Sequence, residues 1–245
     1  MSLPSSKSVR LRVEPGSACG TLEQGWLRRR SLATASRAVG GSNIRPSAAQ
    51  APLPSPAGDG QAEAIDAVLV ELAATISLQG ARLEVELADS FMHLDVVAGD
   101  FSDDSDRQLQ SVAAACMAEL LGDAAQGHEL RWQLQSDARH LLIGAIARGQ
   151  LGALSDAAMR HGLSLASVQP DFCGQWNRHG GALGAGSAVF AVACGREAVI
   201  ACVADGAICD ISSGTWLDRN GTPGLLDTRV DRVLASPLLR AQQTA

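Results

Sequence analysis

The stretch GSAVFAVACGREAVIACVADGAICDISSG, residues 186–214, contains three short apolar runs separated by two tight turns. Asp205-Gly206 separates two of these runs, and both residue types tolerate the positive φ angles of a type I′ turn. The other turn carries Ala193-Cys194-Gly195. We therefore predict an antiparallel meander of three strands joined by two hairpin turns.

Upstream of this meander, residues 61–179 alternate between helical and extended patterns. From Ile65 to Ile76 the apolar residues recur at helical spacing, which predicts an amphipathic helix that ends at Gly80. In residues 83–87, Leu-Glu-Val-Glu-Leu, apolar and charged residues alternate as in a strand with one solvent-exposed face. The succession of elements predicts a mixed α/β sheet with helices against it. The expected strands are 8–13, 17–23, 26–34, 83–87, 92–96, 130–134, 139–146 and 163–168, and the expected helices are 61–79, 104–121, 148–161 and 171–179.

The same pattern suggests a division into two lobes. Residues 1–7 are expected to be a disordered N-terminus, and residues 8–179 a first lobe. Within that lobe, residues 38–60 are rich in Pro, Ser and Gly, which indicates a mobile loop. The glycine-rich residues 180–186 follow a helix and precede a strand, the reverse of a pyrophosphate-binding loop, so we interpret them as a hinge. Residues 187–245 are then a second, truncated lobe that starts with the meander.

Composition excludes several classes of function. The 245 residues carry a net charge of −6 and only 3% aromatic residues, which argues against a nucleic-acid binder. Lys7 is the only lysine, so neither a P-loop nor a Schiff-base lysine is available. The sequence shows no signal-peptide pattern and no run of eighteen apolar residues, and we expect a cytoplasmic protein.

Catalytic and metal-binding patterns are equally scarce. The histidines at 93, 128, 140, 161 and 179 show no ligand spacing, and the six cysteines form no C-x-x-C pair. We therefore expect no catalytic residue and no metal site. The tryptophans serve either as core fillers or as anchors of a protein interface, and both interpretations stay open for Trp26, Trp132, Trp176 and Trp216.

Several segments resemble a known family. They are LEVELADS at 83–90, the charged strand around Arg131-Trp132, and LSLASVQP at 163–170, which leads into Trp176-Asn177-Arg178. Together they resemble bacterial actin-like proteins related to the pilus-assembly protein PilM and to the cytoplasmic domain of the type II secretion protein GspL. The resemblance implies an actin-like (ribonuclease H-like) α/β fold of mixed sheets with flanking helices, with the second half curtailed.

The resemblance also implies a function. Such proteins are cytoplasmic platforms that bind the tail of an inner-membrane partner and couple it to a type IV pilus or type II secretion machine. We thus expect a noncatalytic scaffold, peripheral to the inner membrane through its partner, that binds no cofactor. The acidic positions expected in both phosphate hairpins of this fold are not evident: the first turn reads Glu14-Pro15-Gly16-Ser17 and the second Ala193-Cys194-Gly195.

Two alternatives remain. The first is an ATP-binding enzyme of the same fold, with magnesium and phosphate surrounded by Gly195, Arg196, Asp205 and Gly206. The second is a self-polymerising actin-like subunit, that is, a homo-oligomer.

Overall fold

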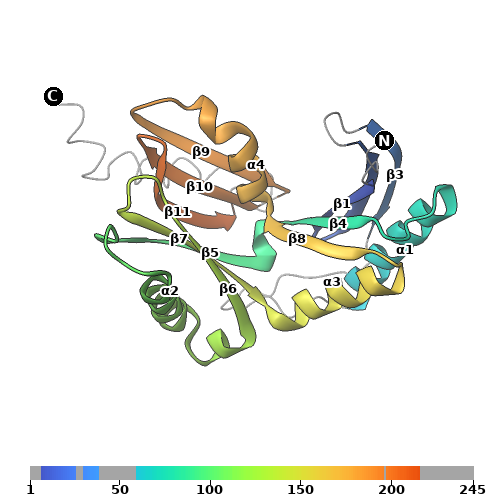
Figure 1. The fold of residues 1–245 in the computed structure, drawn as a ribbon, viewed down its shortest axis with the longest axis horizontal. Coiled ribbons are helices and arrows are strands. Elements are labelled where there is room, and N and C mark those ends of the chain that lie inside the picture. The colour runs from blue at the N-terminus through green and yellow to red at the C-terminus, as the bar shows by residue number, and fades with distance from the viewer. Residues whose placement is uncertain (1–6, 26–29, 39–58, 196, 216–245) are drawn as a thin grey trace, which may run out of the picture. The chain divides into compact units, whose positions relative to one another are not determined.

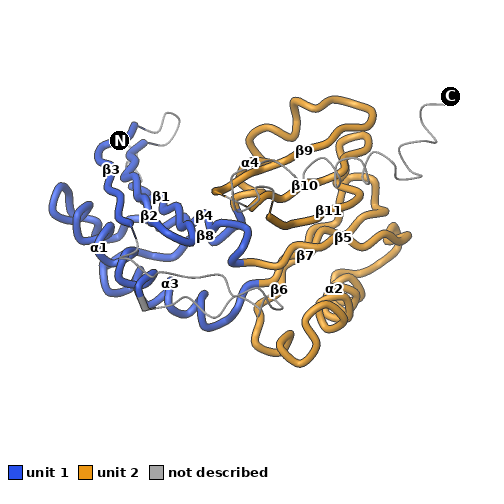
Figure 2. The backbone as a smooth tube through the Cα atoms, turned by 180° about the vertical axis from the view of Figure 1, so that it is seen from behind, with its two compact units in different colours: residues 1–91, 146–170 blue, residues 92–145, 171–245 orange. Residues whose placement is uncertain are grey.

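The computed structural model describes residues 7–25, 30–38, 59–195 and 197–215. The chain divides into two compact units, each made from two separate stretches of sequence (Figure 1 and Figure 2). Unit 1 comprises Met1–Phe91 and Ile146–Pro170, and unit 2 comprises Met92–Ala145 and Asp171–Ala245. The mixed α/β class expected from the sequence is confirmed.

Unit 1 is built on a five-stranded sheet with the order β3-β2-β1-β4-β8. Strands β1, β2 and β3 form an antiparallel meander, whereas β4 pairs in parallel with both β1 and β8. The parallel pairs require long crossover connections, and α1 lies in the connection between β1 and β4, while α3 lies in the connection between β4 and β8. The elements of unit 1 are β1 Lys7–Glu14, β2 Ser17–Gln24, β3 Arg30–Ala38, α1 Asp59–Thr75, β4 Arg82–Leu87, a 3-10 helix Asp89–Phe91, α3 Arg148–Arg160 and β8 Ser164–Pro170.

The core of unit 1 lies between this sheet and its helices. Helix α1 packs against β2 and β3, and α3 packs against β8. Gly20 allows the closest approach, because a Cβ atom there would lie 2.6 Å from Cγ1 of Val68 in α1. The apolar stripe predicted for α1 is therefore the face that meets the sheet. Its buried side chains are Ile65, Val68, Leu69 and Leu72, opposite Val9, Leu11, Val13, Leu83, Val85 and Leu87 of the strands.

Unit 2 contains two three-stranded sheets, with the orders β5-β7-β6 and β11-β10-β9. Strand β10 pairs antiparallel with both β9 and β11, which confirms the predicted meander. Strand β7 begins in unit 2, and its last two residues belong to unit 1. The elements are β5 Met92–Ala98, α2 Asp106–Leu121, a 3-10 helix Gly122–Gly127, β6 His128–Leu134, β7 His140–Ala147, α4 Asp171–His179, a 3-10 helix Gly180–Ala182, β9 Ser187–Cys194, β10 Glu197–Ala204 and β11 Ala207–Thr215.

Two apolar clusters stabilise unit 2. The first joins α2 to the β5-β7-β6 sheet through side chains that include Leu109, Met117 and Leu141. The second joins β7 and α4 to the meander around Phe172, which is fully buried. The Phe172 and Phe190 rings meet edge to face, with centroids 5.6 Å apart. Both sheets of unit 2 therefore contribute to its cores.

The second cluster explains why the compact units differ from the expected lobes. Leu94 and Leu142, from the expected first lobe, pack in one cluster with Val199 and Ile208 of the meander. Consequently residues 92–145 belong to the same unit as residues 171–245, and the glycine tract 180–186 lies inside unit 2. The predicted hinge was placed from local composition, which cannot reveal such long-range packing.

Smaller differences concern the bounds of the expected segments. Lys7 belongs to β1, whereas residues 1–6 lie outside the described residues. Strand β3 was expected at 26–34 but extends to Ala38, because its partner strand β2 offers pairing positions as far as Ser17. Most of the predicted loop 38–60 and the end of the second lobe, residues 216–245, are outside the described ranges.

Candidate functional site

The two hairpins of the meander carry the residues predicted to surround a phosphate. Cys194 pairs with Glu197 across the first turn, and Ala204 pairs with Ala207 across the second, so each turn has two residues. Asp205 and Gly206 have φ angles of 49° and 81°, as the type I′ prediction requires. Asp205 is thus a non-glycine residue in the left-handed region, which aspartate tolerates better than most residues.

The carboxylate of Asp205 is used within the fold. Its Oδ1 accepts a hydrogen bond from the backbone N–H of Gly186 at 2.9 Å. In return, the backbone N–H of Asp205 donates to the carbonyl oxygen of Gly186, also at 2.9 Å. This reciprocal pair ties the β10–β11 turn to the residue that precedes β9, and it accounts for an aspartate at this turn without a ligand.

The predicted phosphate-binding residues do not form one cluster. Gly195 lies in the β9–β10 turn, whereas Asp205 and Gly206 lie in the β10–β11 turn at the opposite end of β10. Strand β10 has eight residues, so these turns are separated by roughly 25 Å at about 3.3 Å per residue. Arg196 lies outside the described residues. The arrangement does not fit a single phosphate held by both turns.

The β1–β2 turn of unit 1 also uses its acidic residue locally. Glu14 accepts a hydrogen bond from Nε of Arg12 at 3.0 Å and one from Oγ of Ser17 at 3.4 Å. Glu14 pairs with Ser17 in the ladder, so Pro15 and Gly16 form a two-residue turn. The carboxylate of Glu14 therefore stabilises the hairpin that contains it.

One face of the unit 1 sheet carries interleaved charges. The parallel register places Arg10 opposite Glu84, and the Nη2 atom of Arg10 lies 3.9 Å from Glu84 Oε2 and 3.7 Å from Glu23 Oε2. On the same face, Glu86 is only 7% exposed, and Nε2 of Gln169 donates to its Oε1 at 3.4 Å. The face of the sheet that was predicted to be solvent-exposed is thus partly buried. Its alternating charges are visible in the sequence, but their pairing depends on the parallel register.

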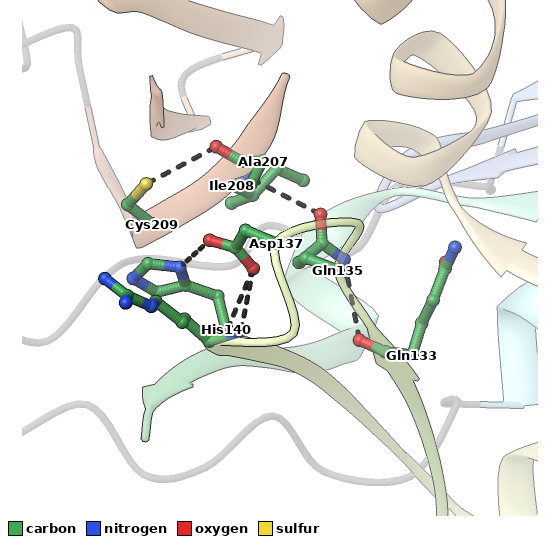
Figure 3. Close-up of polar contacts among 8 residues, drawn as sticks. Gln133, Gln135, Asp137, His140, Ala207, Ile208 and Cys209 are labelled. Atoms are coloured by element: carbon green, nitrogen blue, oxygen red, sulfur yellow. Dashed lines mark hydrogen bonds and ion pairs between the residues drawn. The ribbon is translucent and has the colours of Figure 1, made fainter. Parts of the chain in front are cut away.

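A polar network that the sequence analysis missed surrounds the β6–β7 turn (Figure 3). Oδ2 of Asp137 accepts a hydrogen bond from Nδ1 of His140 at 2.6 Å, while its Oδ1 accepts backbone N–H groups of Arg139 and His140. From the same turn, Gln135 Oε1 accepts the backbone N–H of Ile208 in β11 at 3.3 Å. The network closes the turn and joins it to the meander within unit 2.

Electrostatics in this region favour structural roles over nucleophilic ones. Partial burial alone would raise the pKa of Asp137, but the hydrogen bonds from Arg139 and His140 together lower it. Burial raises the pKa of the Cys209 thiol, and the charges of Asp137, Asp205 and Asp210 add to that effect. Because the thiolate is the reactive form of cysteine, Cys209 is a poor nucleophile.

The described residues contain no group of three or more His, Cys, Asp or Glu side chains placed to hold a metal ion. Trp132 and Trp176 are partly buried against the two apolar clusters of unit 2, so both contribute to cores. Trp26 and Trp216 lie outside the described ranges. Among the helices that the structure describes, none combines the length and apolar character needed to cross a membrane.

Comparison with known proteins places this architecture in the actin-like fold. No protein-family model matches the sequence. A search of the curated proteins finds no match either. Solved structures do match: a Bacteroides thetaiotaomicron protein with an actin-like ATPase fold and unknown function has a TM-score of 0.54 at 9% identity, covering 94% of this chain and 75% of its own.

Two further solved structures are those that the sequence resemblance suggested. The PilM-PilN type IV pilus biogenesis complex matches with a TM-score of 0.62 at 12% identity, over 98% of this chain and 69% of the matched chain. The cytoplasmic domain of EpsL, an inner membrane component of the type II secretion system of Vibrio cholerae, matches with a TM-score of 0.53 at 13% identity, over 86% and 71%. The expected likeness to these proteins is confirmed at the level of the fold.

Proposed function

We propose that this protein is a noncatalytic actin-like scaffold that binds a peptide segment of a protein partner in a type IV pilus or type II secretion type machine. The partner in this proposal is the cytoplasmic tail of an inner-membrane assembly protein. The scaffold would then work in the cytoplasm, held at the membrane through that partner, and would need no nucleotide.

The main observation in support of the proposal is that the carboxylate of Asp205 forms a hydrogen bond within the fold. Its carboxylate accepts the N–H of Gly186, and the turn that contains Gly195 lies at the other end of β10. A nucleotide-binding member of this fold needs groups that converge on the phosphates and their metal ion. Asp205, the acidic candidate for that task, stabilises its own hairpin turn instead.

The likeness to the PilM-PilN complex and to the EpsL cytoplasmic domain supports the choice of machine. Both are components of assembly systems, and the first is a complex of two proteins. Fold likeness alone is a weak argument for function, and the proposal therefore also requires a surface suited to a peptide.

Strand β8 at the edge of the unit 1 sheet is such a surface. It pairs with β4 on one side, and the strand order of the described residues ends there. Its exposed residues Ser164, Ala166 and Ser167 are small and uncharged. Edge strands are normally protected by charges or prolines, and an unprotected edge accepts an added strand through backbone hydrogen bonds. Strand β8 carries no charge, and its one proline is its last residue, Pro170.

Two measurements test the proposal. The first is a thermal-shift titration with magnesium ATP, for which we expect no rise in Tm at millimolar nucleotide. The second is a fluorescence-anisotropy titration with a synthetic peptide that carries the cytoplasmic tail of a single-span inner-membrane protein from the same organism's pilus or secretion machine. We expect saturable binding, weakened at least about tenfold by Ala166→Lys, because an edge lysine opposes strand addition.

The matched control is Val70→Lys, which adds the same charge at an exposed position of α1, 58% accessible, and should leave peptide binding unchanged. A rise in Tm of several degrees with magnesium ATP would overturn the noncatalytic assignment. Failure of the tail peptide to bind, or equal binding by the Ala166→Lys variant, would overturn the proposed docking of the tail on β8.

A further inference from the structure

Strand β6 forms one edge of the β5-β7-β6 sheet in unit 2. In the part of the chain that the structure describes, its neighbour in this sheet is β7. The N–H of Gln135, the residue directly after β6, donates to the carbonyl oxygen of His140 in β7 at 2.8 Å, so the backbone N–H of Gln135 points toward β7. Because these groups alternate along a strand, the N–H and C=O groups of His128, Leu130 and Trp132 point away from β7.

The carbonyl of Leu130 shows this outward orientation. It accepts a hydrogen bond from Nη1 of Arg131, the neighbouring side chain, at 2.9 Å. The same Nη1 lies 2.7 Å from Oε1 of Glu129. The Arg131 side chain is 82% exposed. The Arg131 side chain is therefore solvent-exposed and reaches the outer edge of β6, where it can turn toward a carboxylate of an added strand.

The two faces of β6 differ in character. Leu130, Trp132 and Leu134 pack against the apolar cluster beneath α2. Glu129 and Arg131 alternate with them and belong to the opposite face. Along this opposite face, a carboxylate and a guanidinium are thus separated by one residue that points the other way.

We propose that β6 pairs antiparallel with β6 of a second copy of this chain, with Leu130 of each copy at the centre. In this register, Glu129 of one copy lies directly opposite Arg131 of the partner subunit, and Arg131 lies opposite the partner subunit's Glu129. Opposite charges at directly opposed positions stabilise antiparallel strands. The outward backbone groups of Leu130 face the same groups of the second copy, as the hydrogen-bonding pattern requires.

Charge excludes the neighbouring registers. Pairing centred on Glu129 would place two carboxylates opposite each other, and pairing centred on Arg131 would do the same with two guanidinium groups. Like charges directly opposite destabilise strand pairing. A short strand with the order Glu129, Leu130, Arg131 is therefore complementary to itself in one antiparallel register.

Helix α2 leaves room for this arrangement. Nε1 of Trp132 donates to Oε1 of Gln110 at 2.9 Å, which identifies the side of α2 nearest to β6. One and two turns further along that side are Ala114 and Ala118, both exposed. In the antiparallel pair, the α2 helices of both copies lie on the same face of the joined sheets, and these methyl groups permit their approach.

The dimer does not depend on the proposed tail binding, because β6 and β8 belong to different sheets. Sedimentation velocity of the full chain over a dilution series from high micromolar to nanomolar tests it. We expect a reversible dimer. Glu129→Arg and Arg131→Glu should each weaken dimerisation at least about tenfold, because each places like charges opposite each other, whereas the double variant should restore it.

Circular dichroism of each variant verifies that the fold is kept. Glu119→Arg, at an exposed position of α2, is the matched control for a change of charge away from β6 and should dimerise like the wild type. A wild-type chain that stays monomeric throughout the series would overturn the inference. A dimer that is indifferent to the single reversals, or that the double variant fails to restore, would overturn it as well.

Discussion

Replacing Asp205 tests whether its carboxylate stabilises the fold or serves a ligand. The Asp205→Ala variant loses the hydrogen bond from Gly186 to Oδ1, which joins a backbone N–H to a charged acceptor at 2.9 Å. Such bonds contribute about 1.5–3 kcal/mol, and the exposed setting of this bond favours the lower value. Alanine at a φ of 49° adds about 1 kcal/mol for the left-handed backbone. We therefore expect a loss of about 2.5 kcal/mol.

Two companion variants separate these contributions. Asp205→Asn keeps an acceptor oxygen and tolerates the left-handed region, so we expect it to cost less than about 1 kcal/mol. Asp205→Gly removes the backbone strain together with the hydrogen bond, and it should lie between the Asn and Ala variants. The order of stability expected is wild type, Asn, Gly and then Ala.

The assay is urea unfolding without nucleotide, followed by circular dichroism, with midpoints compared at equal m-values. If Asp205 instead held a metal for a nucleotide, Asp205→Ala would leave the stability of the free protein nearly unchanged. Equal stability of the Ala variant and the wild type would thus refute the structural role of Asp205. So would an Asn variant as unstable as the Ala variant, because the acceptor geometry would then not matter.

Two further predictions concern unit 2. Phe172→Ala should reduce the free energy of unfolding by about 3–5 kcal/mol, because Phe172 is fully buried and its truncation leaves a cavity. Urea unfolding measures this loss. A loss under about 1 kcal/mol would contradict the packing described. Burial and the nearby charge of His128 lower the pKa of His93 below its ordinary value. As pH falls through that ordinary value the unfolded chain gains the proton first, so stability should decrease on acidification, and His93→Gln should flatten this dependence in thermal melts at a series of pH values.

The local elements of this protein follow from neighbouring residues. The two-residue turn at Asp205-Gly206 and the buried stripe of α1 were predictable, because turn geometry and helical periodicity depend on residues close in sequence. The segments that resemble the pilus and secretion proteins also led to the correct fold. Charge alternation in β1 and β4 predicted a polar face but not its partners.

Only the tertiary structure decided how these hairpins and helices pack together. Asp205 with Gly186 and Gln135 with Ile208 are bonded pairs whose members lie far apart in the sequence. The same holds for the cluster around Phe172, which places residues 92–145 in one unit with the meander. Such contacts form because chain folding brings distant groups to hydrogen-bond distance and buries their apolar neighbours, and no local pattern records which groups will meet. The sequence by itself thus determined the hairpins, the helices and the fold class, whereas packing between distant segments determined which residues form each compact unit and that Asp205 stabilises the fold.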